Sequence, residues 1–348
     1  MLADRVRGCI FGAALGDAAG LATEFLTSTV AASFYGPDAD FKPGCDVFPD
    51  EHRMMWCAGD WTDDTDQTVL MLQSLLQSGG AANPVDFADR LQRWRHSGFP
   101  ELGDESGAGL GQTTKAVLND PKFLGDPHAT ARAHSHSTPS NGGVMRTAVA
   151  GIPNFWDEDV VSETAASLCL TTHADPRCVA SCIGVAVCIS RLLRGLDLED
   201  AGNEAAPDTV SLQNKILAPA LVRAREFLHA ECPQGTDATE SFAAHTEVQP
   251  GRRGLEQLQL DETRRIGYTF KCLGAGLWAL KSEEGFRETL NQLILCAGDA
   301  DTNAAVAGAL LGCRLGYSQL PDDWIKGMPY SSWLEAYVQK VVFMLGLR

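Results

Sequence analysis

Apolar residues recur at helical spacing in several parts of the chain, and this pattern predicts a series of helices. Residues 69–76 form an apolar, helix-like run directly after a polar stretch. Phe87, Leu91 and Trp94 predict a helix over 84–96 in which Trp94 faces the core, and a one-sided apolar pattern predicts another over 332–345. Further helices are expected over 113–118 and 212–230. The run 179–193 is interrupted by serines and an arginine, so it predicts a buried core helix, and no membrane partner is expected.

Glycines at positions 8, 12, 16 and 20 recur every fourth residue near the N-terminus. This spacing places them on one face of a helix, where a second backbone can approach closely. Two arginines ahead of an apolar stretch could imitate a secretory signal, but Asp17 interrupts that stretch. We therefore expect a protein that is not secreted.

Acidic and hydroxyl side chains crowd the stretch 59–68, immediately before the helix-like run. Adjacent ionised carboxylates repel one another, and they survive together mainly where water, a helix N-terminus or a cation offsets the repulsion. The stretch can therefore be a capped helix start, with Thr62 or Asp63 as the N-cap, or part of a cation site. Its side chains are Thr62, Asp63, Asp64, Thr65, Asp66 and Thr68.

A second acidic stretch, 297–303, repeats this chemistry near the other end of the chain. Asp299, Asp301 and Thr302 again precede a run of small apolar residues. Two helix starts with hard oxygen ligands suggest one shared site, although two independently capped helices would show the same pattern. Carboxylate and hydroxyl oxygens without histidine or thiolate select magnesium, manganese or calcium over zinc. With so many carboxylates, a pair of divalent ions balances the charge better than one.

Composition narrows the class of function. A formal net charge of −17 argues against nucleic-acid binding, which needs a basic face. The 11 cysteines are scattered through apolar segments without a Cys-x-x-Cys pair. We therefore expect buried free thiols in a reducing compartment, the cytoplasm or also the nucleus. With 348 residues, of which 45% are hydrophobic, the chain can fill one sizeable core.

Four motifs stand in order along nearly the whole chain, at residues 12–24, 61–65, 141–146 and 298–303. Together they resemble the ordered motifs of the ADP-ribosylglycohydrolases. The resemblance implies a compact, all-α orthogonal helical bundle with one domain spanning 1–348. It also implies a central cleft that holds two Mg²⁺ ions, or Mn²⁺, and an ADP-ribose unit. We expect variable loops near 119–140, 195–210 and 232–261, the last of which could form a lid or a partner surface.

The resemblance assigns roles to individual residues. Glu24 is expected to handle the proton, and two nearby cations should lower its pKa so that it acts as a base. Without the motif, Glu24 is equally well explained as a solvated residue at the start of a loop. The implied metal ligands are Thr62, Asp63, Asp64, Asp299, Asp301 and Thr302, and the implied catalytic residues are Glu24, Asp63 and Asp301.

The resemblance also implies a substrate surface. A glycine-rich loop is expected beside the distal ribose, and a turn of amides and small hydroxyls around the diphosphate, with Arg146 packed behind it. A histidine is expected near the substrate, although a helix-capping turn would explain His173 equally well. The implied substrate-binding residues are Gly109, Gly111, Thr138, Ser140, Asn141, Gly142, Gly143, Met145 and His173.

Two departures from the family pattern affect the expected substrate contacts. Gly109 stands where nitrogenase-regulating members carry an aspartate, which argues against that role. Pro139 stands where some relatives stack an aromatic residue on adenine, so we suggest Phe155 or Trp156 for that contact. His134 and His136 lack a third ligand, and we expect the stretch 119–140 to be irregular surface chain.

The resulting hypothesis is a magnesium-dependent hydrolase. It would cleave the bond at C1″ of the distal ribose in an ADP-ribose conjugate and release ADP-ribose. The sequence leaves several alternatives for the leaving group: a protein arginine or serine, another acceptor, or a 1″-phosphate. The alternatives are a non-catalytic ADP-ribose-binding protein and a purely structural descendant, and the intact acidic stretches argue against both. We expect a monomer.

Overall fold

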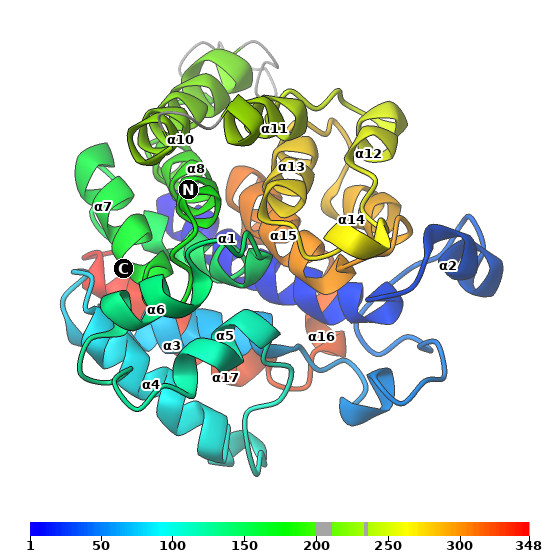
Figure 1. The fold of residues 1–348 in the computed structure, drawn as a ribbon. Coiled ribbons are helices and arrows are strands. Elements are labelled where there is room, and N and C mark those ends of the chain that lie inside the picture. The colour runs from blue at the N-terminus through cyan, green and yellow to red at the C-terminus, as the bar shows by residue number, and fades with distance from the viewer. Residues whose placement is uncertain (199–210, 233–235, 348) are drawn as a thin grey trace.

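The computed structural model describes residues 1–198, 211–232 and 236–347, and these residues form an all-α fold (Figure 1). Two isolated β-bridges, between Glu24 and Gly298 and between Ser140 and Tyr268, are the only strand-like pairings in these ranges. The expected fold class is thus confirmed.

The helices follow one another in the order labelled in Figure 1. The α-helices are α1 (Leu2–Gly20), α2 (Ser28–Tyr35), α3 (Asp63–Gln77), α4 (Pro84–Ser97), α5 (Gln112–Leu118), α6 (Pro127–Ser135), α7 (Glu158–Cys169), α8 (Pro176–Leu193), α10 (Ala218–Glu231), α11 (Thr236–Thr246), α12 (Arg252–Leu258), α13 (Thr269–Leu280), α14 (Phe286–Ile294), α15 (Ala300–Leu315), α16 (Asp322–Gly327) and α17 (Ser331–Met344). The 3₁₀ turns are η1 (Leu21–Thr23), η2 (Arg53–Met55), η3 (Pro100–Leu102), η4 (Asn141–Gly143), η5 (Thr147–Gly151), η7 (Thr263–Arg265) and η8 (Tyr317–Gln319), and η6 (Leu212–Leu217) is π-helical. Every helix predicted from the apolar pattern is present.

α1 and α15 form the central pair, and they run antiparallel with their backbones in contact. A Cβ atom placed on Gly12 would lie 2.1 Å from the carbonyl oxygen of Gly308. Only glycine permits this approach, as the four-residue spacing predicts. Gly20 lies against the first turn of α15, at Asp301. The glycine face therefore brings the end of α1 to the start of α15.

The other helices surround this pair. α13 and α14 pack against α15, α8 packs against α7, α10 and α13, and α3 packs against α4 and α17. α8 is long and apolar enough, by length and composition, to cross a membrane, but 83% of it is buried inside the protein. It is a core helix, as predicted. One hydrophobic core extends from Val6 in α1 to Val342 in α17.

The expectation that 119–140 is irregular is wrong, because this stretch contains α6. Asp126 is the N-cap of α6 and accepts a hydrogen bond from the Ala129 amide (3.0 Å), and Pro127 occupies the first turn. This Asp-Pro pair is a helix-start signal. The stretch 232–261 contains α11 and α12, and the buried Phe242 anchors α11 in the core. Residues 199–210 of the remaining loop lie outside the described ranges.

Candidate metal and substrate site

The two acidic stretches meet where α3 and α15 begin. Thr62 is the N-cap of α3, and Asp299 is the N-cap of α15. Thr62 Oγ1 lies 3.4 Å from Asp301 Oδ2, and Thr302 Oγ1 lies 3.3 Å from Asp64 Oδ2. The structure therefore joins residues from opposite ends of the chain in one buried group, which we call the acidic cluster.

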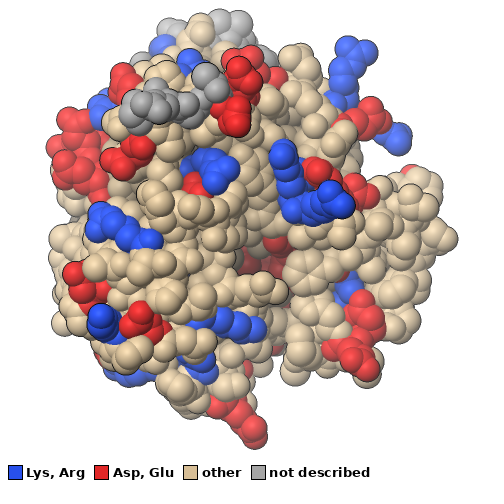
Figure 2. All heavy atoms as spheres, in the orientation of Figure 1, with Lys and Arg blue, Asp and Glu red and all other residues tan. Residues whose placement is uncertain are grey.

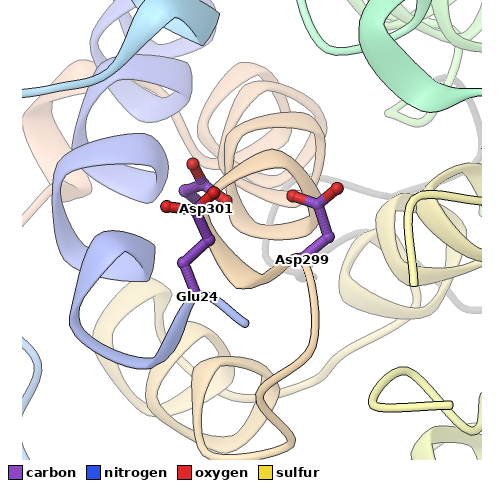
Figure 3. A group of neighbouring side chains, drawn as sticks. All are labelled: Glu24, Asp299 and Asp301. Carbon is purple, nitrogen blue, oxygen red and sulfur yellow. The ribbon is translucent and has the colours of Figure 1, made fainter. Parts of the chain in front are cut away.

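Glu24, Asp299 and Asp301 form a part of the acidic cluster that could hold a metal ion. One carboxylate oxygen from each residue lies within 4.8 Å of the other two, and all three residues are buried. Figure 3 shows Glu24 beside Asp301, with Asp299 facing them across a gap. In Figure 2, Asp or Glu atoms are visible at the bottom of a hollow near the middle of the molecule, with Lys and Arg atoms near its rim.

The acidic cluster fits divalent cations that prefer oxygen ligands. Oδ1 of Asp64 and Oδ1 of Asp301 are buried without a hydrogen-bond partner among the described residues. An unpaired buried carboxylate is costly, and a cation would offset that cost. Carboxylate and hydroxyl oxygens are ligands that suit magnesium and manganese.

Burial and mutual repulsion raise the pKa values of the carboxyl groups in the cluster. Burial, followed by repulsion from Asp17, raises the pKa of Asp63 to about 8 and the pKa of Asp64 well above its usual value. Burial raises the pKa of Asp301 in the same way. It also raises the pKa of Glu24, although a hydrogen bond from a histidine opposes this shift. The lowered pKa expected for Glu24 depends on bound cations and stays a prediction.

Asp17, on the glycine-faced helix α1, holds the start of α3. Its fully buried carboxylate accepts hydrogen bonds from the Thr62 amide (3.0 Å) and hydroxyl (2.8 Å) and from the Thr65 amide (2.9 Å) and hydroxyl (2.6 Å). Asp63 and Asp64 lie between these two threonines, so Asp17 fixes the segment that carries them. This role was not predicted. The signal that could have found it is the one carboxylate that interrupts the small and apolar second half of this helix.

Asp66 and Thr68 serve the local structure of α3. The Asp66 carboxylate accepts hydrogen bonds from the indole nitrogens of Trp61 (2.8 Å) and Trp94 (3.0 Å). The Thr68 hydroxyl donates to the Asp64 carbonyl (2.8 Å). Trp94 is buried, as predicted, so its aromatic ring belongs to the core.

The turn η4, with Asn141 as its first residue, is attached directly to the acidic cluster. Asn141 Nδ2 donates to Asp299 Oδ2 over 2.9 Å. His173 lies next to this turn, since a Cβ placed on Gly142 would lie 3.0 Å from His173 Nε2. Burial lowers the pKa of His173 to about 3, so its imidazole is neutral. His173 therefore supports the turn without adding charge.

Met145 and Arg146 follow the turn and are buried. Arg146 donates hydrogen bonds to Gln67 Oε1 and to the Thr172 hydroxyl (2.6 Å), and Gln67 Nε2 donates to Asp63 Oδ2 (2.6 Å). Burial lowers the pKa of Arg146 to about 10. A buried chain of hydrogen bonds thus links the residues behind the turn to Asp63. Gln67 was not predicted, because a glutamine within an amphipathic helix carries no distinguishing signal.

The glycine-rich loop reaches the acidic cluster at Gly109. The φ angle of Gly109 is +85°, and a Cβ placed there would lie 2.5 Å from Asp63 Oδ1. An aspartate at this position would therefore need a different loop conformation. Gly111 is the exposed N-cap of α5, and an added Cβ there would meet no atom within 4 Å. Of these two glycines, only Gly109 lies against the cluster.

A cavity of about 830 Å³ opens beside the turn. Its lining includes Thr138, Ser140, Tyr268 and His245. The rings of Tyr268 and His245 are 5.4 Å apart between centroids. The cavity therefore offers both polar side chains and an aromatic surface close to the turn.

Phe155 and Trp156 lie far from this cavity, so the suggested adenine contact there is not supported. Ser190, near the end of α8, donates to the Phe155 carbonyl (2.6 Å), whereas Cys178, near the start of α8, donates to the Ser140 carbonyl (3.1 Å). The intervening part of α8 rises about 18 Å. Tyr268 is the aromatic residue that the structure places beside the turn.

Glu24 contacts two residues outside the predicted set. Its Oε2 lies 2.5 Å from His52 Nε2, and Arg53 donates a hydrogen bond to its main-chain carbonyl. Both residues come from the segment 36–61, which has no helical or strand periodicity. No signal in the sequence marks either of them.

His134 and His136 are exposed near the end of α6. His134 Nε2 lies 2.8 Å from Asp120 Oδ2. Among the described residues, neither histidine joins a group of metal-ligand type.

Comparison with known proteins identifies the class of this protein. The family profile described as ADP-ribosylglycohydrolase matches residues 1–346. The chain belongs to this family and is a hydrolase of its class.

The similarity extends over nearly the whole chain. This chain is 26% identical over 345 residues to the ADP-ribosylarginine hydrolase Tri1 of Pseudomonas putida, and the alignment covers 97% of this chain and 78% of that protein. It is 29% identical over 349 residues to the ADP-ribosylhydrolase ARH3 of Mus musculus, covering 92% and 86%. A solved structure of an ADP-ribosylglycohydrolase-related protein complex matches with a TM-score of 0.67 and 25% identity, covering 99% and 98%.

Proposed function

We propose that this chain hydrolyses the bond at C1″ of the distal ribose in an ADP-ribose conjugate and releases ADP-ribose in a magnesium-dependent reaction. The observation that carries this proposal is the hydrogen bond from Asn141 to Asp299, which attaches the glycine turn to the acidic cluster. A turn suited to a diphosphate and a cluster suited to divalent cations therefore adjoin. This is the arrangement that a nucleotide-linked ribose requires.

The acidic cluster would bind the reacting end of the substrate. Magnesium or manganese bound there supplies Lewis-acid polarisation and activates a water molecule. Burial of the ligands keeps bulk water out and strengthens electrostatic effects at the site. Asp17 and Gln67 hold the start of α3 and Asp63 in place through their hydrogen bonds. The residues that would hold two ions are Thr62, Asp63, Asp64, Asp299, Asp301 and Thr302.

Glu24 would accept the proton of the attacking water. Its carboxylate is buried and has an oxygen within 4.8 Å of oxygens of Asp299 and Asp301, so it reaches the same centre. A carboxylate beside cations stays ionised at neutral pH and acts as a base. The usual pair of glycosidase carboxyl groups is then not required.

The turn and the neighbouring cavity would bind the rest of the ADP-ribose. The Asn141 amide of η4 donates to the Gly267 carbonyl, and the amides of Gly142 and Gly143 can donate hydrogen bonds to a diphosphate. Ser140 lines the cavity next to the turn, and Tyr268 offers a ring that can stack on a base. Gly109 leaves space for the distal ribose beside Asp63, because it has no side chain.

The leaving group would be a protein side chain or a phosphate on C1″. Two relatives are named ADP-ribosylarginine hydrolases, so ADP-ribosyl-arginine is the first conjugate to test. The alternative function, ADP-ribose binding without turnover, is disfavoured because the acidic residues of both stretches are present and converge.

The test is release of ADP-ribose, with and without EDTA, from four substrates: ADP-ribosyl-arginine, ADP-ribosyl-serine, poly(ADP-ribose) and ADP-ribose 1″-phosphate. Turnover that EDTA abolishes would support the proposal and name the leaving group. If no substrate is turned over while ADP-ribose raises the melting temperature, the chain is a binding protein.

A further inference from the structure

The Glu24 carboxylate has one hydrogen-bond partner among the described residues, and this partner is His52. His52 Nε2 lies 2.5 Å from Glu24 Oε2. The His52 side chain is 28% exposed, whereas that of Glu24 is 9% exposed. His52 therefore lies at the edge of the site, on the solvent side of Glu24.

Arg53, the next residue, fixes the main chain that carries Glu24. It is 2% exposed, and it donates hydrogen bonds from Nε to the Ala22 carbonyl (2.9 Å) and from Nη2 to the Glu24 carbonyl. Asp50 holds the same guanidinium group through Nη1. Two consecutive residues of one segment thus bind the side chain and the main chain of Glu24 separately.

Glu24 pairs with Gly298 through its main chain, but no hydrogen bond other than that to His52 orients its side chain in the described part of the molecule. Glu24 follows η1, and the next residue, Phe25, has a φ of +60°, so the chain changes direction here. Asp299 and Asp301 lie close to the Glu24 carboxylate (Figure 3), and like charges repel one another. An unrestrained Glu24 side chain would therefore turn away from the cluster. The hydrogen bond from His52 opposes that movement.

We propose that His52 is a positioning residue, which holds Oε2 of Glu24 and leaves Oε1 to face the acidic cluster. Its expected effect on rate rests on the proposed function, but its effect on the position of Glu24 does not. His52 acts on Glu24 and not on the substrate, so its loss should appear in kcat more than in KM.

Two substitutions distinguish the contribution of the His52 hydrogen bond from that of the packing of its ring. The imidazole packs against Phe25, with 5.1 Å between ring centroids. His52→Phe keeps a ring there and removes the donor, whereas His52→Gln keeps an amide donor. We expect His52→Phe to lower kcat by about 10- to 100-fold, with KM changed less than about threefold. His52→Gln should retain at least about a third of the wild-type kcat, because the hydrogen bond is restored.

Two further measurements do not depend on turnover. A crystal structure of His52→Phe should show the Glu24 carboxylate displaced by about 1 Å or more, the scale at which catalysis suffers. The affinity for Mn²⁺, measured by electron paramagnetic resonance, should stay close to that of the wild type, because Glu24 is not one of the six residues proposed to hold the ions. If the wild type turns over none of the conjugates, the proposed function fails, and the crystal structure alone decides the role of His52.

The matched control is His128→Phe. His128 on α6 is half-buried, and its Nε2 lies 2.8 Å from the Ser167 carbonyl oxygen, so it also has one hydrogen bond. Its substitution should leave kcat unchanged. The proposal is overturned if Glu24 in His52→Phe stays within about 0.5 Å of its wild-type position. It is also overturned if kcat is retained, or if kcat, Mn²⁺ affinity and melting temperature fall together.

Discussion

Asn141 donates a hydrogen bond from Nδ2 to Oδ2 of Asp299 across 2.9 Å, and this bond joins the glycine turn to the acidic cluster. Asn141 lies near the middle of the chain, and Asp299 is the N-cap of α15 near its end. The bond therefore sets the separation between the surface suited to a diphosphate and the residues suited to cations. A substrate whose ribose and diphosphate are covalently linked requires that this separation be fixed.

Asn141→Ala should lower kcat/KM by about 10- to 100-fold, because a hydrogen bond to a charged group contributes about 1.5–3 kcal/mol. Steady-state release of ADP-ribose measures this effect. Asn119→Ala is the control, since Asn119 is exposed and its side chain accepts one hydrogen bond, from Arg95, among the described residues. An Asn141→Ala variant with wild-type kcat/KM would show that the turn and the cluster act independently.

The contact between α1 and α15 should not tolerate a side chain. A Cβ on Gly12 would lie 2.1 Å from the Gly308 carbonyl oxygen, so Gly12→Ala should lower the free energy of unfolding by about 3 kcal/mol or more. Urea denaturation measures the change. Gly184→Ala on α8 is the matched control, because its Cβ would lie 3.5 Å from Leu273, at ordinary contact distance. The Gly184→Ala variant should be as stable as the wild type. If Gly12→Ala is also as stable as the wild type, α1 and α15 do not pack this closely.

Asp17→Asn should destabilise the fold and weaken cation binding at the acidic cluster. The amide group would place a donor against the amide and hydroxyl donors of Thr62 and Thr65. We expect a loss of about 2 kcal/mol in the free energy of unfolding, together with weaker Mn²⁺ binding. Asp89→Asn, which removes an exposed ion pair with Arg93, should change stability by less than about 0.5 kcal/mol. Unchanged Mn²⁺ affinity in Asp17→Asn would contradict the role given to Asp17.

Stability should depend on pH and magnesium together. An aspartate in an unfolded chain titrates near pH 4, whereas burial and repulsion raise the pKa of Asp63 to about 8 in the fold. The fold thus favours the protonated group, and this contribution is lost as the pH rises from about 4 through about 8.

The melting temperature of EDTA-treated protein should therefore be lower at about pH 8.5 than at about pH 6. Magnesium should raise the melting temperature more at the higher pH, because its ligands must release their protons. Scanning fluorimetry at the two pH values measures both effects. An equal rise at both values would mean that magnesium does not bind these carboxyl groups.

Several features could be predicted from the sequence because they have a local period or a repeated chemistry. The glycine spacing predicted the approach of α1 to another backbone, and the two Asp-Thr stretches predicted that Asp64 and Asp301 belong together. α6 could also have been found from Asp126 and Pro127. These signals depend on residues that lie near one another in the chain.

Other parts of the site depend on contacts between distant segments. His52 lies in a stretch without periodicity, and only the fold brings it to Glu24. The aromatic residue beside the turn, Tyr268, comes from a segment more than a hundred positions later. Phe155 is close to the turn in sequence, but it contacts Ser190 near the end of α8 that lies away from the turn. Residues that are close in sequence can therefore lie far apart in the fold, and the sequence alone does not show this.

The most direct test of the proposed function is the return of Mg²⁺ to EDTA-treated protein. Release of ADP-ribose would be measured from the conjugate that the wild type turns over fastest, with Asp301→Asn assayed in parallel. Mg²⁺ should restore release by the wild type, while Asp301→Asn should retain less than about 1% of it. Full release in EDTA, or equal release by the Asp301→Asn variant, would contradict a metal-dependent site at the meeting point of α3 and α15.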